Sequence, residues 1–113
     1  MNRFTLAAVC AIAALPALGG EKPMRIWNLT SSPIVDLRLA PQGSQAFSAD
    51  LTKRDKDGEI EHDERLVLGD MTPGDYDARV KLKDGRACSL AGLRLTAGKV
   101  TAIEESNLEN CAK

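Results

Sequence analysis

The sequence predicts an all-β protein, a small antiparallel β-sandwich of about seven to eight strands. Apolar and polar residues alternate with a period of two along most of the chain, and we find no convincing helix pattern. Turn-forming residues separate the alternating segments at short, regular intervals. The dipeptide Asp84-Gly85, which lies between two such segments, is typical of a two-residue β-hairpin.

Residues 1–20 have the composition of a cleaved secretory signal peptide. A positively charged start that ends at Arg3 precedes an almost unbroken apolar run, and the small residues Ala17 and Gly19 stand where a signal peptidase reads the chain. The apolar run is shorter than the ~20 residues that a membrane-spanning helix needs. We therefore expect a single domain over 21–113, exported to the periplasm and without a membrane span.

The N-terminal half of this domain contains three expected strands. The first, 24–29, ends before Pro33, and we expect its residue Trp27 to lie in the core. The second, 34–39, alternates apolar and charged residues. The third, 46–52, is weaker because it carries only two large apolar residues.

Turn signals divide the C-terminal half into further strands. The turn at Pro73-Gly74 precedes the clearest alternation of the chain, and the Asp84-Gly85 signal follows it. Residues 106–113 are expected to be a polar tail. The expected strands of this half are 65–68, 76–83, 86–90 with a continuation at 93–95, and 100–104.

Two cysteines remain once the signal peptide is removed, because Cys10 lies within it. An even number of cysteines in a small exported domain indicates a disulfide, which pairs Cys88 with Cys111. The alternative, a metal-binding or redox-active thiol pair, fits poorly with their wide separation in the sequence. A disulfide would hold the tail against the rest of a domain that is poor in aromatic residues.

The segment 55–64 is the main functional lead. It holds six carboxylates and one lysine, a formal charge of −5, whereas the whole chain has a formal charge of −1. So many like charges in one short segment are unfavourable unless a cation lies near them. A comparison with an EF-hand loop places Gly58 correctly, but Lys53 stands where the first aspartate is required, so this is no EF-hand.

We expect instead a β-hairpin with its tip at 53–58 and a returning strand that begins at Glu59. Carboxylates from the tip and from the returning strand would then converge on a hard cation, either Ca²⁺ or a lanthanide(III) ion. Zinc is disfavoured because it prefers nitrogen and sulfur ligands and the chain has one histidine. The expected metal ligands are Asp55, Asp57, Glu59, Glu61 and Glu64.

A hairpin on a sheet surface supplies only part of a coordination sphere. Water or a second copy of the protein would complete it, so a metal-bridged homodimer is a secondary hypothesis. The alternative function is an envelope interaction module that binds no metal and contacts a periplasmic protein partner through charged patches. Its basic patch would consist of Arg79, Lys81, Lys83 and Arg86. A third interpretation is a solvated loop whose charges prevent aggregation.

Two function classes find little support. Nucleic-acid binding is disfavoured because the mature chain carries fourteen basic against sixteen acidic residues and has few aromatics. Catalysis is disfavoured because His62 is the lone histidine and no nucleophile motif accompanies it. We therefore expect a protein that is not an enzyme.

The C-terminal half resembles a group of known proteins. Tyr76-Asp77-x-Arg79-Val80, followed by Asp84-Gly85-Arg86, resembles a stretch of small exported β-sandwich proteins of α-proteobacteria. The combination with the acidic segment is similar to the small periplasmic lanthanide chaperones of methylotrophic bacteria. The first resemblance implies the fold more than a function, and the second implies lanthanide binding in the periplasm.

Overall fold

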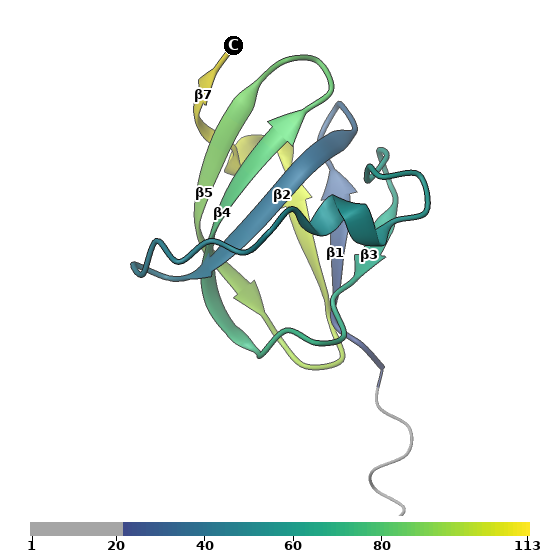
Figure 1. Cartoon of the computed structure of the whole chain (residues 1–113), viewed down its shortest axis with the longest axis vertical. Helices are drawn as coiled ribbons and strands as arrows, with labels where there is room; N and C mark the ends of the chain where they lie inside the picture. Colours follow the sequence, from purple (N-terminus) through teal and green to yellow (C-terminus); the bar gives the residue numbers. More distant parts are fainter. Residues whose placement is uncertain (1–21) are drawn as a thin grey trace, which may run out of the picture.

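The structure is a computed structural model that describes residues 22–113 (Figure 1), so the expected signal peptide at 1–20 lies outside the described residues. Strands dominate the described chain, with two short 3₁₀-helices between them. In chain order the elements are β1 (Arg25–Leu29), β2 (Ile34–Pro41), η2 (Leu51–Arg54), β3 (Arg65–Val67), β4 (Gly74–Leu82), β5 (Ala87–Leu95), β6 (Val100–Glu104), η3 (Glu105–Asn107) and β7 (Glu109–Ala112).

The seven described strands form two sheets. One has the order β3-β1-β6 and the other the order β2-β4-β5-β7. All neighbouring strands are antiparallel except β1 and β6, which are parallel. Both sheets contribute buried apolar side chains to one core cluster, among them Ile26 and Ile103 from the first sheet and Leu37, Val80 and Leu95 from the second. The all-β prediction is confirmed.

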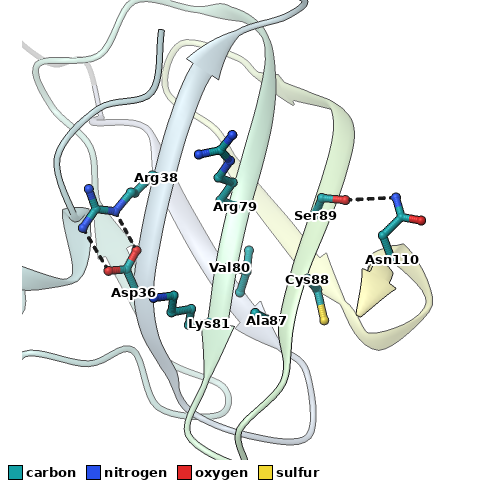
Figure 2. Close-up of a pocket in the computed structure, with 9 residues that line it drawn as sticks. All are labelled: Asp36, Arg38, Arg79, Val80, Lys81, Ala87, Cys88, Ser89 and Asn110. Carbon is teal, nitrogen blue, oxygen red and sulfur yellow. Dashed lines mark hydrogen bonds and ion pairs between the residues drawn. The ribbon is translucent and has the colours of Figure 1, made fainter. Parts of the chain in front are cut away.

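Strand β4 shows how the period-two pattern divides the second sheet into two faces. Its buried residues include Ala78 and Val80, whereas Arg79 and Lys81 between and after them are exposed on the outer face. Figure 2 shows Arg79 and Lys81 on β4, beside the neighbouring strands β2 and β5. The hairpin predicted at Asp84-Gly85 is present, because β4 pairs with β5 on either side of it.

The predicted strand at 46–52 is wrong. This segment runs along the free edge of β2, but it meets that edge mainly with side chains. Asp50 Oδ1 accepts from Leu37 N at 3.0 Å, Ser48 Oγ accepts from Leu39 N at 3.2 Å, and Thr52 Oγ1 donates to Val35 O at 3.3 Å. These short polar side chains satisfy backbone groups that another strand would otherwise satisfy. The chain is thereby free to turn into η2.

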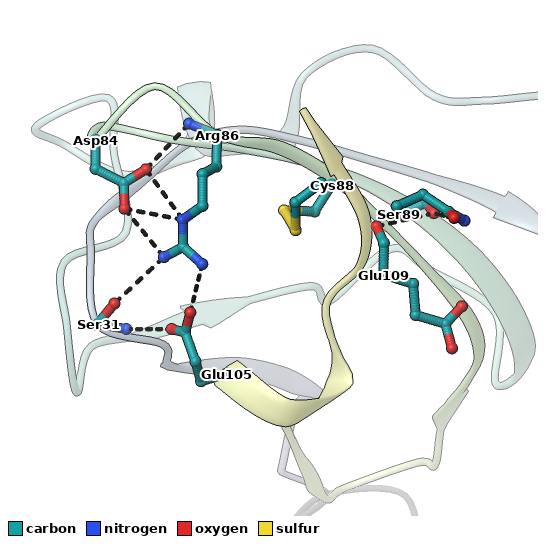
Figure 3. Close-up of a disulfide and its surroundings, with 9 residues drawn as sticks. Ser31, Asp84, Arg86, Cys88, Ser89, Glu105 and Glu109 are labelled. Atoms are coloured by element: carbon teal, nitrogen blue, oxygen red, sulfur yellow. Dashed lines mark hydrogen bonds and ion pairs between the residues drawn. A yellow bond between two sulfur atoms is a disulfide. The ribbon is translucent and has the colours of Figure 1, made fainter. Parts of the chain in front are cut away.

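In the C-terminal half, the strand expected at 86–90 with its continuation at 93–95 is present as one strand, β5, which begins at Ala87 and whose pairing with β4 shifts register between Tyr76 and Ala78. The tail differs from expectation. The tail expected at 106–113 contains η3 and the strand β7, which pairs with β5. The disulfide between Cys88 and Cys111 joins these two strands (Figure 3), so its prediction is confirmed.

Candidate functional site

Residues 55–64, called the acidic loop from here on, form turns and bends and contain no strand, so the predicted hairpin is wrong. Its β pairing is limited to an isolated bridge between Ile60 and Ile34. Gly58 and Asp63 have positive φ angles of 75° and 70°, which are incompatible with an extended strand. The local backbone therefore folds the carboxylates into a compact loop and removes the face alternation that the hairpin assumed.

The middle of the acidic loop is anchored by Ile60, whose side chain is fully buried. The backbone of Ile60 exchanges hydrogen bonds of 2.8 and 2.9 Å with Ile34. The buried Asn28 side chain donates to Ile60 O at 2.8 Å and to Ser32 O at 3.0 Å. An apolar residue inside an acidic segment thus fixes that segment to the core.

The C-terminal part of the loop is tied to β1. Asp63 N donates to Asn28 O at 2.6 Å, and Asn28 N donates to Glu64 O at 2.9 Å. The Trp27 indole N–H donates to Asp63 Oδ1 at 2.9 Å, and this half-buried tryptophan also lies under the Arg65 guanidinium at 4.1 Å. Trp27 is therefore an anchor for the loop on the outer side of β1, which differs from the core position we expected.

The two ends of the acidic loop meet through Asp55 and Glu64. Their carboxyl groups are in hydrogen-bonding contact, which lowers the pKa of Asp55 and raises the pKa of Glu64. Each carboxyl group also accepts a backbone N–H at 2.8 Å, Asp55 Oδ1 from Asp57 and Glu64 Oε1 from Glu61. The two groups repel each other when both are ionised, so the pair favours a proton on Glu64 as the pH falls.

The other expected ligands are placed less favourably. Glu59 forms an ion pair with Lys83 at 3.3 Å, and Asp57 and Glu61 have exposed side chains. Across residues 22–113 no three His, Cys, Asp or Glu side chains come together as a group that could hold a metal ion. Of the five expected ligands, the structure therefore brings Asp55 and Glu64 together and leaves the other three apart from a common centre.

The residues that position the loop carry a weak sequence signal. Asn28 and Thr30 lie in a strand and the turn after it, yet both are fully buried and polar. Thr30 donates to Asn28 Oδ1 at 2.7 Å, and its carbonyl oxygen lies 2.7 Å from His62 Nδ1. The sequence signal is that Asn28 and Thr30 continue the inward-facing positions of the alternating pattern that begins at 24. This signal predicts their burial but does not identify their hydrogen-bond partners.

Comparisons with protein-family models, with curated proteins and with solved structures find no match to this chain. Of the helices in the described part of the chain, none is long and apolar enough to cross a membrane.

Proposed function

We propose that this protein is a periplasmic carrier or chaperone that binds a hard cation, a lanthanide(III) ion or Ca²⁺, through its acidic loop. The observation that supports the proposal is the contact between Asp55 and Glu64. Two neighbouring carboxylates repel each other when both are ionised, and a cation bound between them would remove that repulsion. Oxygen-seeking cations of high charge favour such a pair.

In the proposed metal centre, Asp55 and Glu64 are the first ligands, and the exposed side chains of Asp57 and Glu61 turn toward the cation when it binds. Glu59 would join only after it leaves Lys83, so we place it last among the expected ligands. Ca²⁺ takes six to eight oxygen ligands, more than two carboxylates provide. Water or a second copy of the protein supplies the remainder, which keeps the metal-bridged dimer within the proposal.

The periplasmic location rests on the disulfide. The bond between Cys88 and Cys111 is compatible with an oxidising compartment outside the cytosol. A carrier of hard cations also needs a fold that does not depend on its cargo. The core cluster and the disulfide contain none of the five proposed ligands, so we expect the protein to fold without metal.

Calorimetric titration of the mature protein with LaCl₃ and with CaCl₂ tests the proposal. The double variant Asp55→Asn/Glu64→Gln removes the central pair and should weaken binding by roughly 10- to 100-fold or more, the range seen when even outer-shell partners of a metal are lost. The matched control, Glu104→Gln/Glu109→Gln, removes two carboxylates from β6 and β7 and should bind as the wild type does. Absence of heat and of a thermal shift with both metals would reject the proposal.

The same titration should depend on pH in a defined direction. The contact with Asp55 raises the pKa of Glu64, so a proton competes with the cation for this pair as the pH falls. Binding should therefore be tightest above the raised pKa of Glu64 and weaken as the pH falls through it. Affinity that stays constant from neutral pH to pH ~4, near the reference pKa of a glutamate, would exclude the pair as the binding centre.

A further inference from the structure

The outer face of the sheet β2-β4-β5-β7 carries an open groove (Figure 2). The groove has a volume of about 480 Å³, and a second hollow of about 320 Å³ continues it along the same face. The two hollows share Arg79, Ser89 and Asn110. The first hollow is lined by three basic residues and one acidic residue, Arg38, Arg79, Lys81 and Asp36, together with the smaller Ala87, Ser89 and Asn110. The second hollow adds the carboxylates Asp77 and Glu109, so the excess of positive charge is confined to the first hollow.

Most basic residues near this face already have acidic partners. Lys83 pairs with Glu59 at 3.3 Å, and Arg38 pairs with Asp36 at 2.9 Å. Arg86 lies between Asp84 and Glu105 and also contacts Ser31, as Figure 3 shows. Two of the four residues in the predicted basic patch are therefore neutralised within the molecule.

Arg79 and Lys81 are different. Neither forms an ion pair or a side-chain hydrogen bond with another residue in 22–113, and both are exposed. The Arg79 guanidinium lies over the Phe47 ring at 4.1 Å. Stacking on a ring leaves the guanidinium N–H donors free at its edge and restricts the side chain before any ligand arrives.

The β5 and β7 side of the groove consists of small side chains and of residues held in place by a hydrogen bond and the disulfide. Ala87 and Ser89 on β5 are small, so the surface beside Arg79 and Lys81 is hollow. Asn110 Nδ2 donates to Ser89 Oγ at 3.3 Å, and the neighbouring disulfide holds this side in place. The first hollow thus places Arg79 and Lys81, which form no ion pair within residues 22–113, beside a surface of small side chains.

We propose that this groove binds an extended acidic peptide segment of a partner protein, with carboxylates of alternate residues on Arg79 and Lys81. Side chains two residues apart on a strand are spaced by about 7 Å, and an extended peptide repeats its alternate side chains at the same spacing. The peptide contact is confined to the first hollow, because Asp36 there is already paired with Arg38, whereas Asp77 and Glu109 in the second hollow would repel further carboxylates. A guanidinium with free donors pairs well with a carboxylate.

Fluorescence anisotropy of a labelled peptide of alternating Glu and Val tests this proposal with the mature, disulfide-bonded protein. Binding should weaken as salt rises, and a Lys-Val peptide should not bind. The variant Arg79→Gln/Lys81→Gln should weaken binding about tenfold or more. The matched control Lys22→Gln/Lys99→Gln removes the same charge from exposed sites outside the groove and should bind as the wild type does.

A second variant guards against loss of folding in the first. Ser89→Glu places a carboxylate in the groove while both cations remain, and it should also weaken binding. If the control and the groove variant weaken peptide binding equally, the proposal is overturned, because the peptide would then respond to the overall charge of the protein and not to the groove. Binding of inorganic polyphosphate without binding of the peptide would also overturn it. This groove shares no residue with the acidic loop, so the cation titration of the groove variant should match the wild type.

Discussion

Asp50 shows how much of this fold depends on a single carboxylate. It accepts hydrogen bonds from Leu37 N at 3.0 Å and from Thr52 N at 2.9 Å, and it lies 2.7 Å from Thr52 Oγ1, whose single proton is shared between Asp50 and Val35 O. The first bond covers the edge of β2, and the two contacts with Thr52 begin η2. Burial works to raise the pKa of Asp50, but the hydrogen bonds from Leu37 and Thr52 outweigh it and lower the pKa.

The lowered pKa of Asp50 predicts a loss of stability in acid. The ionised form is favoured in the folded state, so its contribution is complete above the unfolded pKa of about 3.9 and is lost as the pH falls through the folded pKa. Asp50→Asn should therefore reduce the loss of unfolding free energy between neutral pH and acid, whereas Asp50→Ala should lower stability by ~1–3 kcal/mol already at pH 7. Urea denaturation at a series of pH values measures both effects. An unchanged acid slope in Asp50→Asn would contradict this account.

At the scale of elements, β7 depends on its neighbour more than on burial. All four of its residues are exposed, and its pairing with β5 consists of Ala87 with Ala112 and Ser89 with Glu109. The disulfide from Cys88 to Cys111 adds a covalent link at this strand. A strand with no buried side chain adds little through the hydrophobic effect, so the covalent link is its main attachment.

Removal of the disulfide should therefore release β7 first. The variant Cys88→Ala/Cys111→Ala should lose on the order of 3 kcal/mol of unfolding free energy, the value expected for closure of a loop of this length. Hydrogen exchange resolved by residue should show faster exchange for the amides of 109–112 than for β4. Equal protection of β7 in the variant and the wild type would show that strand pairing alone holds it.

The element scale also explains which strands were predictable. The β4–β5 hairpin follows from clean alternation and a strong turn dipeptide, both of which are local properties. The segment 46–52 has a partly alternating pattern as well, yet Ser48, Asp50 and Thr52 bind the edge of β2 through their side chains. Short polar residues compete with strand pairing in this way, and only the presence of a neighbouring edge decides the outcome.

At the scale of the whole molecule, the modest formal charge of −1 includes an acidic loop and, elsewhere on the surface, a hollow where basic residues outnumber acidic ones. The acidic loop is anchored to β1 of one sheet and to Ile34 at the start of β2, whereas the first hollow of the groove lies on the outer face of β2, β4 and β5. A cation on the loop would reduce repulsion there and leave the groove unchanged. The two proposed activities can therefore be measured separately.

Self-association belongs to this scale too. If a second copy completes the metal coordination, light scattering should show a doubled mass with excess LaCl₃ and the monomer mass after addition of a chelator. Asp55→Asn/Glu64→Gln should stay monomeric under both conditions. A monomer mass at saturating metal would reject the bridged dimer. The cation would then be coordinated by one protein molecule and water.

The sequence by itself determined the all-β class, the pairing of Cys88 with Cys111, and the concentration of carboxylates in one segment. These properties follow from local periodicity, cysteine number and composition. The tertiary structure decided which acidic side chains are in contact. It places Asp55 against Glu64 and pairs Glu59 with Lys83. It also leaves Arg79 and Lys81 without an ion pair among residues 22–113, whereas the neighbouring Arg38 and Lys83 each pair with an acid. Such pairings depend on the packing of distant segments around Ile60 and along β4, which no local pattern encodes.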